Sequence, residues 1–148
     1  MTGRFLVDSN VLIYSTLRND PRHARAGEVL AARLLPGREM FISSQNLAEM
    51  YPNLTGPKTQ PPDNPELARA KISSIAGLDR CTVLPITRSV VEKTLELCER
   101  HQVTRQRYFD FQLVALMELE GIPTIVTENA KDFLSIPGIK VINPFSTT

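Results

Sequence analysis

Acidic residues stand at three places in this chain of 148 residues where carboxylates could meet and bind a metal ion. Asp8 directly follows the apolar run 5–7, which is typical of a buried strand. Glu49 lies on a predicted helix after a second apolar run, and Asp110 opens a predicted buried helix. Crowded carboxylates raise one another's pKa, and a divalent cation can neutralise them. Because oxygen ligands without paired His or Cys favour Mg²⁺ or Mn²⁺ over Zn²⁺, we expect one of those two ions if the carboxylates converge.

An ion of this kind would support hydrolysis of a phosphodiester. Mg²⁺ is usually held by one or two carboxylates and keeps several of its waters. One such water, or a second ion about 3.5–4 Å away, can support in-line attack on phosphorus. Ser9 and Asn10 could add neutral ligands or hold a water, and Glu128 and Asp132 are further acidic candidates.

Each acidic residue also has an ordinary structural explanation. Asp8 and Asp110 could simply cap the helices that follow them. Glu49 could lie on a solvated face of its helix, and Glu128 and Asp132 follow a predicted strand, in a loop where acids are common. Spacing alone therefore leaves both the metal site and these structural roles open.

The elements that would position the acids alternate between strands and helices along the chain. This order predicts an α/β fold with a doubly wound, mostly parallel central sheet and helices on both faces. The carboxyl ends of parallel strands share one edge of such a sheet, where Asp8, Glu49 and Glu128 would lie. Ser9 or Asn10 should cap the first helix, and Pro52 should bend or end the third. Strands are expected at 5–7, 40–42, 81–86, 123–127 and 140–142, and helical apolar patterns at 11–17, 24–35, 47–54, 67–76, 91–98 and 111–119.

The composition fits one globular domain spanning residues 1–148. The hydrophobic content of 42% and charged content of 22% are those of an ordered soluble protein. Cys81 and Cys98 lack CxxC spacing and are expected to be reduced core thiols. We expect a cytoplasmic protein, because no signal peptide is recognisable and no apolar run approaches the ~18 residues of a membrane span. The net charge of +1 argues for no particular partner, although a nuclease that contacts few phosphates need not be basic.

Four blocks of the sequence resemble the PIN-domain nucleases, and in particular the VapC-type toxins of bacterial toxin–antitoxin pairs. The blocks are FLVDSNVLI at 5–13, ISSQNLAE at 42–49, YFDFQLVA at 108–115 and PTIVTENAKDF at 123–133. The resemblance implies a doubly wound α/β domain that cleaves RNA with Mg²⁺ or Mn²⁺. By motif position, it implies that Asp8 and Asp110 are the chief metal ligands and that Glu49 completes the acidic pocket. Asn10 matches a polar position near the metal.

The resemblance leaves the fourth acidic position open. Many relatives have an acid where Asn129 stands, whereas this chain offers Glu128 one position earlier and Asp132 three positions later. We favour Glu128 as a metal ligand, and Asp132 could instead fix the loop. Arg105 and Arg107 could hold RNA phosphates or belong to a solvated basic segment. The family further implies an RNA substrate, a homodimer and a cognate antitoxin protein whose tail occupies the acidic groove.

We therefore expect a metal-dependent endoribonuclease that cleaves RNA with metal-activated water and acts as the toxin of a toxin–antitoxin pair. One alternative is a non-catalytic RNA- or protein-binding domain with a vestigial acidic site. A second is a Mg²⁺-dependent phosphatase, which would want Asp-x-Asp where this chain has Asp8-Ser9-Asn10. The sequence does not give the RNA target, and the long loop 56–65 is a candidate for selecting it.

Overall fold

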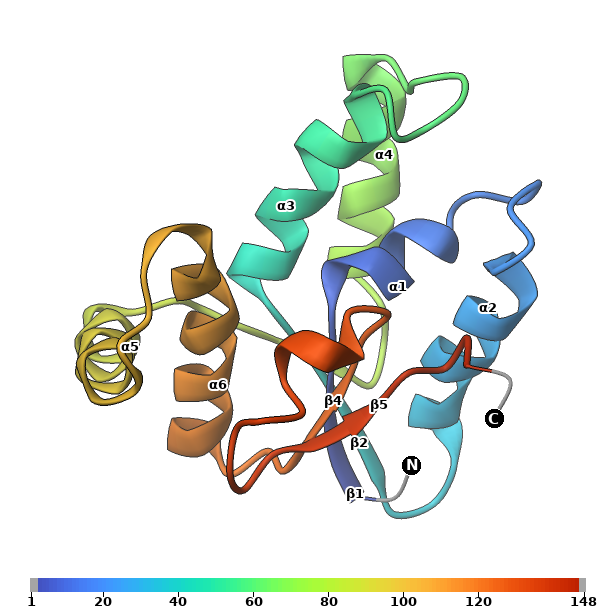
Figure 1. Cartoon of the computed structure of the whole chain (residues 1–148). Coiled ribbons are helices and arrows are strands. Elements are labelled where there is room, and N and C mark those ends of the chain that lie inside the picture. The colour runs from blue at the N-terminus through green and yellow to red at the C-terminus, as the bar shows by residue number, and fades with distance from the viewer. Residues whose placement is uncertain (1–2, 147–148) are drawn as a thin grey trace.

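The computed structural model describes residues 3–146 and places a parallel sheet at their centre (Figure 1). The strands of this sheet are in the order β3-β2-β1-β4-β5, and every pair of neighbours is parallel. Because β1 is central and the chain winds outward on both sides of it, the predicted doubly wound α/β fold is confirmed. The strands are β1 (Gly3–Val7), β2 (Arg38–Ser43), β3 (Cys81–Leu84), β4 (Thr124–Val126) and β5 (Lys140–Ile142).

Helices cover both faces of the sheet, as the alternating pattern predicted. Side chains alternate along β1, so Phe5 and Val7 enter one core while Leu6 enters the other. The first core is closed by α1 (Ser9–Tyr14), α2 (His23–Ala31), α3 (Ser44–Thr55) and α4 (Pro65–Ala76). The second is closed by α5 (Arg88–His101) and α6 (Tyr108–Glu120), which lie together on the left in Figure 1. Every residue from Phe111 to Met117 is buried, which confirms that α6 is a central helix.

Polar residues at the strand ends start the helices that carry the candidate site. Asp8, and not Ser9 or Asn10, is the N-cap of α1, because its side chain accepts a hydrogen bond from the Ser9 backbone amide. Ser43 caps α3 in a capping box with Asn46. Thr87 caps α5. These caps turn the chain directly from a strand into a helix at the carboxyl edge of the sheet.

One helix end agrees with its apolar pattern and another differs. α3 runs through Pro52 to Thr55, as the pattern to residue 54 predicted, so of the two effects expected of Pro52 the ending of the helix is wrong. The last turn survives the missing amide because Leu54 is fully buried in the first core. α1 ends at Tyr14, whereas the apolar pattern extended to Leu17, because turn residues follow Tyr14 and carry Leu17 against the same core.

The remaining predictions about the chain concern the cysteines and membrane spans. Cys81 and Cys98 are free and partly buried thiols that pack against the first and second cores, respectively. Within residues 3–146, no helix combines the length and apolar character that crossing a membrane requires.

Candidate active site

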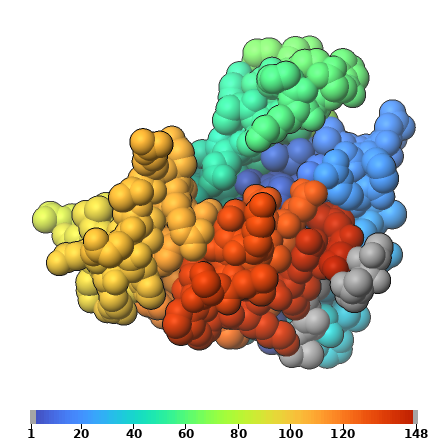
Figure 2. Space-filling model, viewed as in Figure 1, coloured from blue at the N-terminus to red at the C-terminus, as the bar shows by residue number. Residues whose placement is uncertain are grey.

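A pocket of about 340 Å³ lies at the carboxyl edge of the sheet. Asp8, Asn10, Glu49, Asp110 and Glu128 all line it, so the structure brings these predicted site residues together. Figure 2 shows this face, where the dark blue residues after β1 lie in a hollow between α3, in teal, and the C-terminal segment, in orange. The side chains come from elements on both faces of the sheet and meet above the strand ends.

Asp8 is the most buried of these acids, with 7% of its surface exposed. Its Oδ1 accepts hydrogen bonds from the Ser9 amide at 2.8 Å and from Asn46 Nδ2 at 3.2 Å. Its Oδ2 accepts one from Thr127 Oγ1 at 2.8 Å. Burial raises the pKa of Asp8 even though these donors act in the opposite direction. Asp8 therefore caps α1 and also lines the pocket, so its capping role is confirmed and its role as a metal ligand stays a prediction.

Glu49 faces the pocket from α3 and is only partly exposed, so a fully solvated position is wrong for it. Its Oε1 accepts a hydrogen bond from Gln45 Nε2 at 2.7 Å, and its Oε2 accepts a longer one from Ser9 Oγ at 3.4 Å. Burial raises the pKa of Glu49, and the nearby charge of Asp8 raises it further. The carboxylate is thus held in the pocket close to a second acid.

Asp110 is the third residue of α6 and does not cap it, since the N-cap position is occupied by Arg107. Burial raises the pKa of Asp110 to about 6, and the charges of Asp132, Asp8 and Glu49 add to the shift. The guanidinium of Arg107, 4.0 Å from Asp110 Oδ2, acts in the opposite direction. The capping explanation for Asp110 is therefore wrong, and its carboxylate belongs to the acidic cluster.

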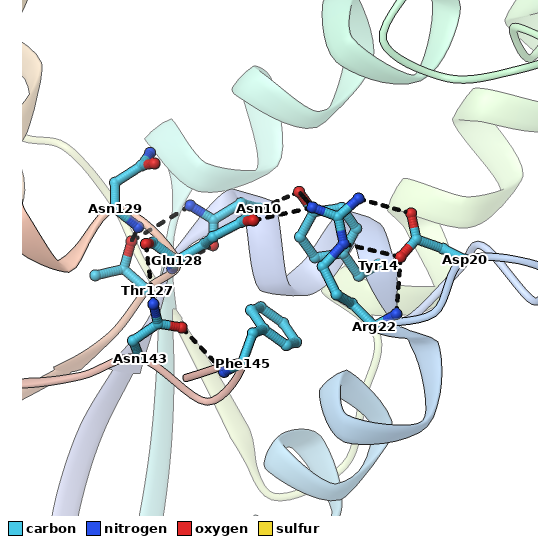
Figure 3. Close-up of polar contacts among 9 residues, drawn as sticks. All are labelled: Asn10, Tyr14, Asp20, Arg22, Thr127, Glu128, Asn129, Asn143 and Phe145. Carbon is cyan, nitrogen blue, oxygen red and sulfur yellow. Dashed lines mark hydrogen bonds and ion pairs between the residues drawn. The ribbon is translucent and has the colours of Figure 1, made fainter. Parts of the chain in front are cut away.

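Glu128 lines the pocket, but its carboxylate is occupied by a cluster on the α1–α2 side (Figure 3). Tyr14 Oη donates to Glu128 Oε2 at 2.5 Å, and Arg22 donates to Glu128 Oε1 at 2.9 Å. Arg22 also lies over the Tyr14 ring, 3.8 Å from its centroid, and is paired with Asp20. Burial and the bond to Glu128 raise the pKa of Tyr14 to about 12, so this phenol stays protonated as a donor.

Asp132 is the acid of the last block whose charge reaches the cluster. Its negative charge raises the pKa of both Asp8 and Asp110. Asp132 ends the short 3-10 turn Ala130–Asp132 and does not line the pocket, whereas Glu128 does. Both acids therefore stay candidates for the fourth acidic position.

Asn10 and the arginines before α6 have different places relative to the pocket. Asn10 Oδ1 accepts from the Glu128 amide at 3.1 Å, and its Nδ2 donates to Thr127 Oγ1 at 3.3 Å. Asn10 thereby ties α1 to the segment after β4 (Figure 3). Through Thr127, which donates to Asp8, it also supports Asp8. Arg107 is close to Asp110, whereas Arg105 is exposed and does not line the pocket.

Several residues of the site were missed by the sequence reasoning. Asn46 and Thr127 hold Asp8, Gln45 holds Glu49, and Arg22 holds Glu128. Asn46 and Thr127 stand inside two of the four motif blocks, and that position could have marked them as site residues. Arg22 has no such signal, because it lies 106 positions from its partner.

The pocket has an excess of negative charge. Within residues 3–146, neither Asp8 nor Glu49 forms an ion pair, and the pair of Asp110 with Arg107 is long. Over the same residues, no three Asp, Glu, His or Cys side chains are grouped so that they could hold a metal ion by themselves. Chemically, the pocket is an anionic cluster of oxygen donors with fixed orientations.

Known proteins were compared with the chain and its fold. The PIN domain family model matches residues 5–138. Ribonuclease VapC24 of Mycobacterium tuberculosis is 25% identical over 144 residues, which are 95% of this chain and 97% of that protein. The structure of Mycobacterium tuberculosis VapC20, described as a Sarcin-Ricin loop cleaving toxin, has a TM-score of 0.64 at 21% identity and covers 82% of this chain and 86% of its own. DNA-bound VapBC from Salmonella typhimurium has a TM-score of 0.65 at 23% identity, covering 97% and 99%. The chain therefore belongs to the PIN domain family.

Proposed function

We propose that this protein is a metal-dependent endoribonuclease that acts as the toxin of a toxin–antitoxin pair. The observation that carries the proposal is the convergence of Asp8, Glu49 and Asp110 in one pocket, each with a pKa raised by burial and by a neighbouring acid. The relatives support it, since VapC24 is named a ribonuclease and VapC20 is described as a Sarcin-Ricin loop cleaving toxin.

Mg²⁺ or Mn²⁺ fits the donors of this pocket. The donors are carboxylates and amide or hydroxyl oxygens, and their negative charge is largely uncompensated. Mg²⁺ needs only one or two protein carboxylates and completes its coordination with water. Asp8 and Asp110 would hold the ion, and Glu49 would complete the site directly or through a water. A bound ion supplies an activated water for attack on phosphorus and neutralises charge in the transition state.

The chain's own residues supply orientation and charge to this reaction. Asp8 cannot turn freely, because donors from α1, α3 and the end of β4 hold both of its oxygens. Such preorganisation lowers the cost of arranging the site at the moment of reaction. The acids would repel an RNA phosphate when no cation is bound. RNA binding and metal binding are therefore expected to depend on each other.

Cleavage of a mixed RNA pool tests the proposed function. Purified protein, freed of any bound partner, is incubated with Mg²⁺, with Mn²⁺ or with a chelator. We expect cuts at few sites with either metal and none with the chelator. The Asp110→Asn variant should not cut RNA even with metal. If the folded protein does not cut RNA, the non-catalytic binding domain becomes the better explanation.

A pair of variants tests which residue is the fourth acid. Asp132→Asn should weaken Mn²⁺ binding and slow cleavage by roughly fivefold, because it removes a charge that acts on Asp8 and Asp110. Glu128→Gln should leave both within about twofold and lower the free energy of unfolding by at most about 1 kcal/mol, because its carboxylate serves Tyr14 and Arg22. Mn²⁺ titration, cleavage rates and urea unfolding measure these effects. The opposite order of the two variants would restore Glu128 as the metal ligand.

The partners form a second part of the proposal. A cognate antitoxin would cover the acidic pocket, and a homodimer and a cytoplasmic location are proposed on the family resemblance. Arg107, beside Asp110, is the better placed of the two predicted RNA-binding arginines, and Arg105 would contact RNA outside the pocket. A solved structure of similar fold, with a TM-score of 0.63 at 20% identity, is described as a toxin–antitoxin complex from Klebsiella pneumoniae and supports the antitoxin.

A further inference from the structure

A chain of side-chain hydrogen bonds runs from α6 to Glu49 on α3. Tyr108 Oη donates to Gln112 Oε1 at 2.9 Å, and Gln112 Nε2 donates to Gln45 Oε1 at 2.8 Å. Gln45 Nε2 then donates to Glu49 Oε1 at 2.7 Å and to the Phe109 carbonyl at 3.1 Å. Gln112 is 6% exposed, so the middle of this chain is shielded from water.

The direction of this chain is fixed at its Glu49 end. A carboxylate and a backbone carbonyl can only accept, so Gln45 must turn its NH₂ group towards Glu49 and Phe109. The Gln45 carbonyl oxygen then faces Gln112, which must in turn present its own NH₂ group. Rotating either amide by half a turn would place two acceptors against each other. The network therefore has one satisfied arrangement.

The amide pair joins two parts of the molecule that are packed separately. Met50 and Leu54 of α3 lie in the first core, whereas Phe111 and Leu116 of α6 lie in the second. The two helices thus lie against opposite faces of the sheet (Figure 1). Glu49 stands on one of them and Asp110 on the other, so apolar packing within a single core does not hold these two acids together.

We propose that Gln45 and Gln112 are positioning residues that lock α3 to α6 and hold the Glu49 carboxylate in the acidic pocket. This inference rests on the proposed function, since it assigns the pair a role in metal binding and RNA cleavage. Gln45 acts on Glu49 directly, and Gln112 acts through Gln45. Without the pair, Glu49 keeps its place on α3 but loses its 2.7 Å bond from Gln45, and the longer bond from Ser9 at 3.4 Å remains.

Methionine replacements test the pair, because methionine has nearly the shape of glutamine without its donor and acceptor. We expect Gln45→Met and Gln112→Met each to lower kcat about three- to fivefold, with KM for RNA within about twofold. The Kd for Mn²⁺, measured by titration without RNA, should rise by a similar factor. The double variant should match the single ones, because all three break the same chain.

Two further variants make the test specific. Gln102→Met is the matched control, since Gln102 is exposed at the end of α5 and its side chain donates to the nearby Glu99 carbonyl, away from the network. It should change none of these values. Tyr108→Phe removes the hydroxyl that donates to Gln112, and it is the mildest of these changes. Combined with Gln112→Met, it should not add to the effect of that replacement. It keeps the inference testable if a buried methionine variant fails to fold.

The outcomes separate the inference from the proposed function. Multiplicative effects of the two methionines, a change in KM alone, or an unchanged Kd for Mn²⁺ in folded variants would each overturn the positioning role. If the wild-type protein neither binds Mn²⁺ nor cleaves RNA, the proposed function is wrong and the inference fails with it. If the wild type does both and the variants equal it, the inference alone is wrong.

Discussion

Asp8→Asn is expected to slow RNA cleavage by roughly a thousandfold and, at the same time, to make the protein more stable. The loss of activity follows from removing a negative charge that would hold the cation, and it corresponds to about 4 kcal/mol of transition-state stabilisation. Asparagine keeps the shape of the side chain. Its oxygen can still accept from Ser9 and Asn46. The bond from Thr127 is lost, because the asparagine amide is a donor and Thr127 Oγ1 already accepts from Asn10 and Asn129.

The gain in stability follows from the raised pKa of Asp8. Burial raises this pKa above the unfolded value, so the folded protein binds the proton more tightly than the unfolded chain does. The stability that this proton contributes is complete below the unfolded pKa and is lost as the pH rises through the folded pKa. At pH 7 the buried carboxylate is therefore a cost, and its neutral replacement should raise the free energy of unfolding, because burial acts on Asp8 more strongly than the hydrogen bond from Thr127 that is lost.

Cleavage rates and urea unfolding of the same protein samples measure both effects of Asp8→Asn. Asp79→Asn is the matched control, because Asp79 is largely exposed and pairs with Arg33 away from the pocket. It should leave cleavage and stability nearly unchanged. A variant at Asp8 that cleaves RNA normally but is less stable would mean that Asp8 serves only as the cap of α1.

The fold was largely readable from the sequence because the apolar runs are short and alternate with helical patterns. Phe5, Leu6 and Val7 are apolar on both sides of the strand, which is what a central strand with two covered faces requires. Local chemistry at element ends was less readable. Asp8, Ser9 and Asn10 are all good caps, and the choice among them depends on where β1 stops, which pairing with β2 and β4 decides.

The convergence of the three main acids was predictable from the predicted sheet, because parallel strands bring their carboxyl ends to one edge. The fourth acid was not. Glu128 and Asp132 stand four positions apart in one loop, where Glu128 lines the pocket and the charge of Asp132 acts on Asp110, so spacing alone does not choose between them. Gln45 and Gln112 are separated by 67 positions and lie on helices of different cores, so no local pattern could pair them.

Binding of Mn²⁺ is expected to weaken by about tenfold between pH 7.5 and pH 5. The pKa of Asp110 is raised to about 6, chiefly by burial and then by the charges of Asp132 and Asp8. A carboxylate must lose its proton to ligate a metal, so bound metal and bound proton exclude each other there. At pH 5 roughly a tenth of the Asp110 side chains would be ionised, whereas at pH 7.5 nearly all would be.

Mn²⁺ titrations over this pH range, with and without the Asp110→Asn replacement, measure this linkage. The wild-type affinity should fall steeply below pH 6, and the rise in Tm that Mn²⁺ gives should shrink with it. Asp110→Asn should bind Mn²⁺ more weakly at pH 7.5, and its affinity should depend less on pH because one titrating ligand is gone. Some dependence should remain, because Glu49 and Asp8, whose pKa values are also raised, still titrate. An equal slope in both proteins would mean that the ion does not contact Asp110. The cation would then have to be held from the Asp8 side of the pocket. It would not neutralise the negative charges that raise the pKa of Asp110.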